Sequence, residues 1–473
     1  MSSQISILTT LLAIAFASPV TAEDPASVHF ANGIKIGEVT PESAIIWTRL
    51  TKGPELNSDG TPFPKNPDKK RRSKAYKDLD SMEGAAPGIP GEIRLSYQQK
   101  KNKGGEIMTD WITVDLDSNF AGQFELNGLK PGTAYTVTAE GRNTGGTISG
   151  TVEGSFTTAP APNNDATVSF TVVTGQDYPR RDDKANGHQI YPQMTKLGTD
   201  FFVHTGDIEY YDKAEPFADN VELARFKWNR LYALPFQRDF HNHTASYFMK
   251  DDHDTLKNDA WPGQTYGDLT WDEGVALFPE QVPMGKSTYR TMRWGKDLQI
   301  WLVEGRDFRS PNTMPDGPGK SIWGEKQKQW FFDSVKASDA TFRVLISPTP
   351  VVGPDRGNKN DNHANVGFTH EGEELRAFIA AQKNMFVVCG DRHWQYVSVD
   401  PKTDVREYSC GPTTNVHASG FSEDQRSDMH QYLKIKGGFL RAEVSRIDGS
   451  PQIAFRHHSV TGEVYNEDIQ VAE

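Results

Sequence analysis

Four short segments combine carboxylates with imidazole or phenol groups, and each follows an apolar run. They are Thr174–Tyr178 (TGQDY), His204–Asp212 (HTGDIEYYD), Lys250–Asp254 (KDDHD) and Gly390–Trp394 (GDRHW). Crowded carboxylates repel one another unless cations neutralise them or protons are taken up. With oxygen and nitrogen donors and no required thiolate, a cluster of divalent or trivalent metal ions is the natural solution. Two such ions can clamp both oxygens of an in-line displacement at phosphorus, so the pattern predicts metal-dependent hydrolysis.

The four segments lie where strands of a layered α/β fold are expected to end. Over residues 165–473, continuous apolar runs alternate with amphipathic stretches, a pattern typical of buried strands and covering helices. Ligands of open α/β sheets bind beyond the carboxyl ends of the strands, so we expect the segments to meet there. The predicted strands are Val168–Val173, Phe201–His204, Tyr247–Met249, Leu298–Glu304, Phe342–Ser347 and Met385–Cys389, and the predicted helices are Val221–Leu231, Gly324–Val335 and Glu371–Ala381.

Residues 24–160 carry shorter runs in which apolar and polar residues alternate, which predicts antiparallel strands with one solvated face. Leu129–Tyr135 (LKPGTAY) is similar to the turn and tyrosine of a tyrosine corner, so we predict a fibronectin- or Ig-like β-sandwich. A polar insertion, residues 51–90, interrupts it and contains Lys69–Arg72 (KKRR). This basic run would contact a polyanion or form a solvated loop, and we favour the loop.

Residues 1–22 have the pattern of a secretory signal peptide. The apolar run Ile5–Ala17 is short for a membrane span, and Val20-Thr21-Ala22 places small residues where a signal peptidase cleaves. An uncleaved anchor is the alternative, because the segment before the apolar run has no Lys or Arg. We expect a secreted or periplasmic protein with no membrane span after cleavage.

The composition excludes several classes of protein. The chain has 473 residues, of which 36% are hydrophobic, so global disorder is excluded. Its 51 Lys and Arg against 63 Asp and Glu give a net charge of −12, which argues against a globally basic nucleic-acid binder. Two cysteines, Cys389 and Cys410, cannot build a disulfide scaffold. Whether they are bridged stays open, as does the oligomeric state.

The segments HTGDIEYYD, DDHD followed by Asn258, and GDRHW resemble motifs of the PhoD-like alkaline phosphatases, within the calcineurin-type metallophosphoesterase superfamily. Their order and spacing match over about residues 165–415, and the preceding sandwich matches the family's N-terminal domain. The resemblance implies a metallophosphatase-type α/β sandwich preceded by the β-sandwich. It also implies two or three metal ions, with iron and calcium as the family's set, and activity on phosphomonoesters and phosphodiesters.

The resemblance also implies roles for particular residues. Asp207 would bridge the metals, Tyr210 would bind a ferric ion, and the remaining matched metal ligands would be Asp252, Asn258, Asp391 and His393. His253 would protonate the leaving group, and Asp254 would be the carboxylate that orients His253.

The roles of two further residues, Arg392 and Asp177, are predicted from their chemistry and not from a matched motif. We assign to Arg392 the stabilisation of phosphate charge, with surface ion pairing as its alternative. Where the family has a Cys ligand of iron, this chain has Gly175. This leaves the identity of the metals open, and Asp177 is a replacement ligand or a turn-capping residue.

We therefore predict an exported, metal-dependent phosphoesterase that acts through metal-activated hydroxide on a small phosphate ester. A nucleic acid would enter only as a diester substrate. One alternative is a non-catalytic protein that binds a surface polymer on a degenerate phosphatase scaffold. Another is a metal-dependent hydrolase of a different ester, such as a sulfate.

Overall fold

The computed structural model describes residues 27–64, 76, 78–101 and 105–473. The predicted signal peptide, residues 1–22, and the basic run Lys69–Arg72 lie outside the described residues. Within the described ranges, no helix is both long and apolar enough to cross a membrane.

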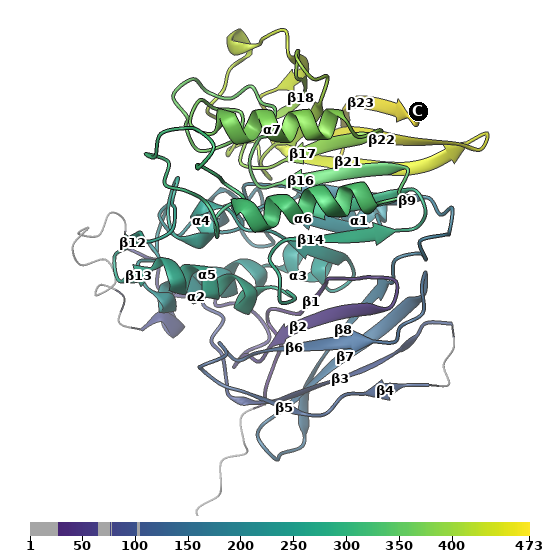
Figure 1. The fold of residues 1–473 in the computed structure, drawn as a ribbon. Helices are drawn as coiled ribbons and strands as arrows, with labels where there is room; N and C mark the ends of the chain where they lie inside the picture. The colour runs from purple at the N-terminus through teal and green to yellow at the C-terminus, as the bar shows by residue number, and fades with distance from the viewer. Residues whose placement is uncertain (1–26, 65–75, 77, 102–104) are drawn as a thin grey trace, which may run out of the picture.

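Two large sheets form the centre of the molecule (Figure 1). The nine-stranded sheet has the order β23 (Val464–Val471), β22 (Ser450–Ser459), β21 (Gly438–Ile447), β9 (Val168–Val173), β10 (Phe201–His204), β11 (Ala245–Phe248), β1 (Ile34–Gly37), β2 (Ser43–Arg49) and β6 (Ala121–Asn127). The seven-stranded sheet has the order β14 (Arg290–Trp294), β15 (Leu298–Leu302), β16 (Phe342–Ser347), β17 (Met385–Cys389), β19 (Arg406–Cys410), β18 (Gln395–Val399) and β20 (His430–Lys434). Strands β9, β10 and β11 pair in parallel, as do β15, β16 and β17.

The core lies between these sheets, with helices on their outer faces. Phe170 and Phe201 of one sheet join Ile300 and Val344 of the other in one buried cluster. The helices are α1 (Ile190–Leu197), α2 (Val221–Tyr232), α3 (Pro235–His241), α4 (Asp252–Thr255), α5 (Trp271–Gln281), α6 (Gly324–Ala337) and α7 (Thr369–Ala380). Helices α6 and α7 cover the seven-stranded sheet (Figure 1), and α1 and α3 cover the nine-stranded sheet. The predicted α/β sandwich is confirmed.

The predicted strands and helices of this body are present with small shifts at their ends. Strand β11 begins two residues before the predicted Tyr247, and α6 continues two residues beyond Val335. In α6, Phe331 is fully buried whereas Trp330 and Phe332 are only partly so. Three consecutive helical residues point about 100° apart, so one apolar stripe cannot bury all of them.

The N-terminal β-sandwich is continuous with the body. Its second sheet contains β4 (Ile107–Met108), β3 (Gly91–Gln99), β7 (Ala134–Arg142), β8 (Ile148–Thr157) and β5 (Ile112–Val114). Strands β1, β2 and β6 face it as the end of the nine-stranded sheet, because β1 pairs in parallel with β11 through Ile36 and Ala245. The tyrosine corner is present, since the Lys130 amide donates to the Tyr135 hydroxyl at 2.9 Å. A further short hairpin joins β12 (Thr265–Tyr266) and β13 (Leu269–Thr270).

Candidate functional site

The carboxyl ends of β9, β10, β11 and β17 meet in one polar cluster, as the sequence predicts. Gly206, after β10, has a φ of 114°, and a Cβ there would lie 2.7 Å from the backbone nitrogen of Asp251. Only glycine therefore lets the loops after β10 and β11 approach so closely. This approach brings Asp207 against the segment that begins at Asp251.

The cluster offers two groups of atoms that could hold metal ions. Atoms of Asp207, Asp252 and His253 lie within 4.8 Å of one another, and so do atoms of Asp207, Asp251 and Asp391. Asp207 is the member common to both groups, which is the geometry a bridging ligand needs. One carboxylate oxygen each of Asp207 and Asp251 is buried with no hydrogen-bond partner among the described residues, whereas Asp391 Oδ2 contacts the Arg392 guanidinium. Asp251 was not predicted as a ligand, although it opens the DDHD motif.

The electrostatics of the cluster favour bound cations. Burial raises the pKa of Asp207 and of Asp251 to about 8, since a charged carboxylate loses its hydration there. Burial opposes protonation of His253, but the nearby Asp252 and Asp207 outweigh it and raise the pKa of the imidazole to about 10. The cluster thus takes up protons when nothing else neutralises it. The donor set, its orphaned oxygens and its charge fit metal ions.

Tyr210 and His393 adjoin the same oxygen atoms. The Tyr210 hydroxyl donates to Asp207 Oδ2 at 3.0 Å and lies 3.2 Å from His393 Nε2. Burial lowers the pKa of His393, which keeps the imidazole neutral, as a metal ligand must be. Gly175 lies beside this imidazole, because a Cβ on it would stand 3.2 Å from His393 Nε2. The position at which the resemblance implies a Cys in the family is therefore next to a predicted metal ligand.

Asn258 and Asp177 are less closely associated with the two groups. Asn258 lines a cavity of about 90 Å³ that Asp207 and His393 also line. Asp177 is buried, with one oxygen unpartnered among the described residues and the other 3.3 Å from Arg180 Nε. It belongs to neither of the two groups found among the described residues.

The carboxylate that holds His253 is Asp212, so the orienting role predicted for Asp254 is wrong. Asp212 Oδ1 lies 2.5 Å from His253 Nδ1. Asp254 instead accepts the backbone amides of Asp207, Glu209 and Asp251 at 2.8 to 3.0 Å. Asp254 therefore joins the loop after β10 to the loop after β11 through hydrogen bonds. Asp212 closes the motif HTGDIEYYD, and its place there was the only sequence clue.

Arg392 does not line the cavity, so the predicted contact with phosphate is wrong as well. Its guanidinium is fully buried, pairs with Asp355 at 2.5 Å and also contacts Asp391. The cations that do line the cavity are Arg356 and Lys359, on the loop between β16 and α7. No motif marks this loop in the sequence.

The two lining cations differ in what they already bind. Lys359 Nζ lies 2.6 Å from Asp259 and 3.2 Å from Asp361. The Arg356 guanidinium lies no closer than 3.5 Å to a carboxylate oxygen among the described residues and 5.7 Å from the Trp394 ring. Of the two cations that line the cavity, Arg356 therefore has its charge less fully neutralised by nearby carboxylates.

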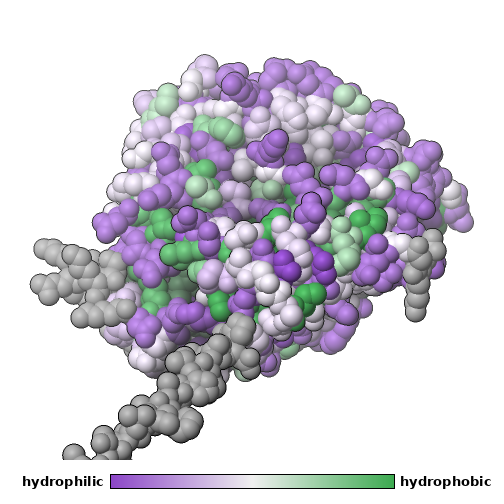
Figure 2. All heavy atoms as spheres, turned by 90° about the horizontal axis from the view of Figure 1, so that it is seen from below, coloured by the Kyte–Doolittle hydropathy of each residue, from purple (hydrophilic) through white to green (hydrophobic). Residues whose placement is uncertain are grey.

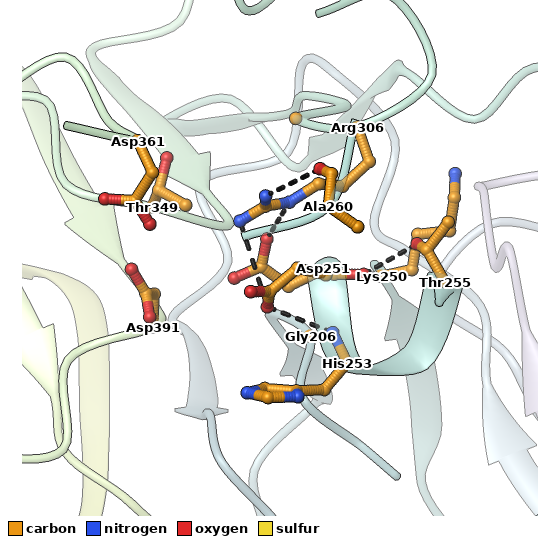
Figure 3. Close-up of polar contacts among 12 residues, drawn as sticks. Gly206, Lys250, Asp251, His253, Thr255, Ala260, Arg306, Thr349, Asp361 and Asp391 are labelled. Atoms are coloured by element: carbon orange, nitrogen blue, oxygen red, sulfur yellow. Dashed lines mark hydrogen bonds and ion pairs between the residues drawn. The ribbon is translucent and has the colours of Figure 1, made fainter. Parts of the chain in front are cut away.

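Arg306 contacts the cluster through Asp251. Figure 3 shows its guanidinium beside Asp251 and the backbone of Ala260, with Asp391 across from it. The Arg306 Nε–Asp251 distance is 2.5 Å, and both side chains are fully buried. This bond leaves Asp251 Oδ2 free of partners among the described residues.

Comparison with known proteins decides the family. The model of the PhoD-like phosphatases matches residues 170–436, and the model of their N-terminal domain matches residues 15–160. The chain belongs to the PhoD-like phosphatase family. It is a phosphoric ester hydrolase by membership, and the acidic and imidazole cluster lies within the matched phosphatase region.

Individual relatives agree with this family. The chain is 22% identical to alkaline phosphatase D of Bacillus subtilis (strain 168), over 86% of this chain and 73% of that protein. The solved structure of PhoD superposes with a TM-score of 0.72 at 17% identity, covering 95% of this chain and 90% of the other. The purple acid phosphatase PPD1 of yellow lupin (Lupinus luteus) gives a TM-score of 0.64 at 12% identity, covering 92% and 73%. These structures share the fold.

Proposed function

We propose that the protein is an exported, metal-dependent hydrolase of small phosphomonoesters or phosphodiesters. The observation that carries the proposal is the group of Asp207, Asp251 and Asp391, of which the first two are buried, joined through Asp207 to Asp252 and His253. A binding scaffold without metals would keep these carboxylates close together at a high electrostatic cost.

The ions would be held by Asp207, Asp251, Asp252, Asp391 and His393, with Tyr210, Asn258 and Asp177 beside them. When bound, they would supply positive charge to the phosphoryl oxygens and lower the pKa of water. Iron and calcium remain the proposed set from the family resemblance. Gly175 supplies no thiolate, so this chain's iron would be held by oxygen and imidazole donors alone.

His253 would act as the general acid. Its Nδ1 is held by Asp212 at 2.5 Å, which leaves Nε2 to face the cavity that the ring lines. The raised pKa keeps the imidazole protonated near neutral pH. A proton at Nε2 can then pass to the oxygen of the departing alcohol.

Arg356 would hold the substrate at the mouth of the cavity. The guanidinium is partly exposed and is not closely paired with a carboxylate among the described residues. Its planar fork matches two oxygens of a phosphoryl group. Lys359, already bound by Asp259 and Asp361, would instead position the loop.

Hydrolysis of p-nitrophenyl phosphate, its bis-ester and p-nitrophenyl sulfate tests this function. Wild type, His253→Ala and the exposed-histidine control His370→Ala would each be assayed with and without a chelator. We expect chelator-sensitive phosphate release that His253→Ala loses and His370→Ala keeps. Turnover of the sulfate alone, or no turnover with any added metal, would contradict the proposal.

Export is a separate part of the proposal. We propose cleavage after Ala22, because small residues precede it and two acidic residues follow it. N-terminal sequencing of the mature protein should begin at Glu23. An intact N-terminus on a membrane-bound protein would favour the uncleaved anchor.

A further inference from the structure

A second cavity, separate from the catalytic cluster, lies between the N-terminal segment and helix α2. It has a volume of about 520 Å³, within the usual range for sites that bind small molecules. The walls come from the segment 79–88, the loop 116–120 and one face of α2. Apolar side chains among its lining residues include Leu79, Leu116, Phe120, Val221 and Phe226.

Arg49, at the end of β2, is the buried cation that lines this cavity. Its side chain is 2% exposed, and its Nε donates to the Asn119 carbonyl at 2.8 Å. Its Nη1 donates to Asn32 Oδ1 at 3.1 Å and to the Ala86 carbonyl at 2.8 Å. These partners are neutral. The hydrogen bonds of Arg49 to the described residues use Nε and Nη1 and none uses Nη2, and the guanidinium lies 5.7 Å from the Phe120 ring.

A buried guanidinium without a close counter-ion is costly, because burial removes its hydration. Burial lowers the pKa of Arg49 to about 9, and the nearby Arg225 adds to this while Asp80 and Glu280 oppose it. The group therefore still carries its charge at neutral pH. Arg225, the other cation in the wall, is bound by Glu280 at 2.5 Å and by two backbone carbonyls. Arg49 alone of the two retains unused donors.

We propose that this cavity binds a small organic carboxylate with an apolar body, whose carboxylate accepts from Arg49 Nη2. An anion satisfies the buried charge, and the apolar walls accommodate a hydrocarbon chain or ring. Acidic side chains of Asp80 and Glu222 also line the cavity, which disfavours ligands with several negative charges such as phosphate. In the lower face shown in Figure 2, exposed apolar side chains form small patches between hydrophilic ones. The cavity combines apolar walls with a buried cation, which suits an apolar molecule that carries one carboxylate.

Calorimetric titration with hexanoate, 4-phenylbutyrate and decanoate tests the proposal, with 4-phenylbutanol as the uncharged counterpart of the second. Wild type should bind at least one carboxylate, and 4-phenylbutyrate should bind about tenfold or more tightly than the alcohol. Arg49→Met keeps the aliphatic stem and removes the charge. It should abolish this preference.

Two further variants keep the test decisive if Arg49→Met does not fold. Val221→Trp places a large ring in the cavity while Arg49 stays intact, so it should abolish binding. Arg94→Met removes a partly exposed arginine of the sandwich that pairs with Glu140, and it should bind as wild type does. Hydrolysis of p-nitrophenyl phosphate should be kept in all variants and reports their folding. Equal binding of acid and alcohol, unchanged binding by Val221→Trp, or no binding of any carboxylate at millimolar concentration would overturn the proposal.

Discussion

Replacing Asp212 with Asn separates the role of this residue from that of its neighbour in the site, Asp254. Asp212 Oδ1 and His253 Nδ1 are 2.5 Å apart, with side chains 12% and 8% exposed. A charge-assisted hydrogen bond this well buried is worth about 1.5–3 kcal/mol. If the bond holds the acid in its reactive orientation, kcat should fall about 10- to 150-fold. KM should change little, because Asp212 does not line the cavity.

The assay compares p-nitrophenyl phosphate with an alkyl phosphate, whose leaving group needs a proton more. Asp212→Asn should lose more activity on the alkyl ester, and this selectivity would not arise from a merely structural defect. Asp254→Asn should instead lower the unfolding temperature, because Asp254 accepts three backbone amides from two loops. Equal losses on both esters for Asp212→Asn would refute the reasoning. So would a stable, inactive Asp254→Asn beside a fully active Asp212→Asn.

Three further predictions concern substrate charge, pH and the Gly175 position. Arg356→Gln should raise KM for p-nitrophenyl phosphate about tenfold with a smaller change in kcat, and an unchanged KM in steady-state kinetics would contradict its role. Burial opposes ionisation of Glu371, but hydrogen bonds from His363 and Ser321 lower its pKa from 4.5 to about 2. The ionised Glu371 therefore adds up to about 3 kcal/mol to the free energy of unfolding. This stabilisation is fully present above the pKa of the group in the unfolded chain, and it is lost as the pH falls from about 4.5 to 2. Urea unfolding should show a weaker pH dependence for Glu371→Gln over that window, and an identical slope would disprove the assignment. Gly175→Ala should weaken metal binding because its Cβ meets His393, whereas Gly145→Ala, also at positive φ but in open space, should not. Equal metal affinity of the two variants would count against the placement of Gly175.

The body of the fold could be predicted because its strands are short, buried runs with clear breaks. Val168–Val173 and Met385–Cys389 have the predicted bounds, since both faces of these central strands are covered. The sharing of a sheet between β1 and β11 could not be predicted. This sharing depends on pairing between residues about 200 positions apart in the sequence. The alternation of apolar and polar residues along β1 does not indicate which strand is its partner.

The candidate site was predictable as a cluster but not in its pairings. Asp207, Asp252, His253 and Asp391 come together because parallel strands end at one edge. Which carboxylate meets His253 depends on how the loop after β10 folds back, and this loop carries both Asp207 and Asp212. The burial of Arg392 depends on Asp355, which lies on another loop. Such pairings are set by tertiary packing, so residue type and spacing alone could not supply them.

The metal content of the purified protein tests the central claim most directly. After loading with iron and calcium and removal of free metal, elemental analysis should find two or three ions per chain. Asp207→Ala should lose most of them, because both groups of ligand atoms share this carboxylate. Asp333→Ala, on the surface helix α6, should keep them all. A wild-type chain that retains no ion under any loading condition, or an Asp207→Ala variant with full occupancy, would contradict the account.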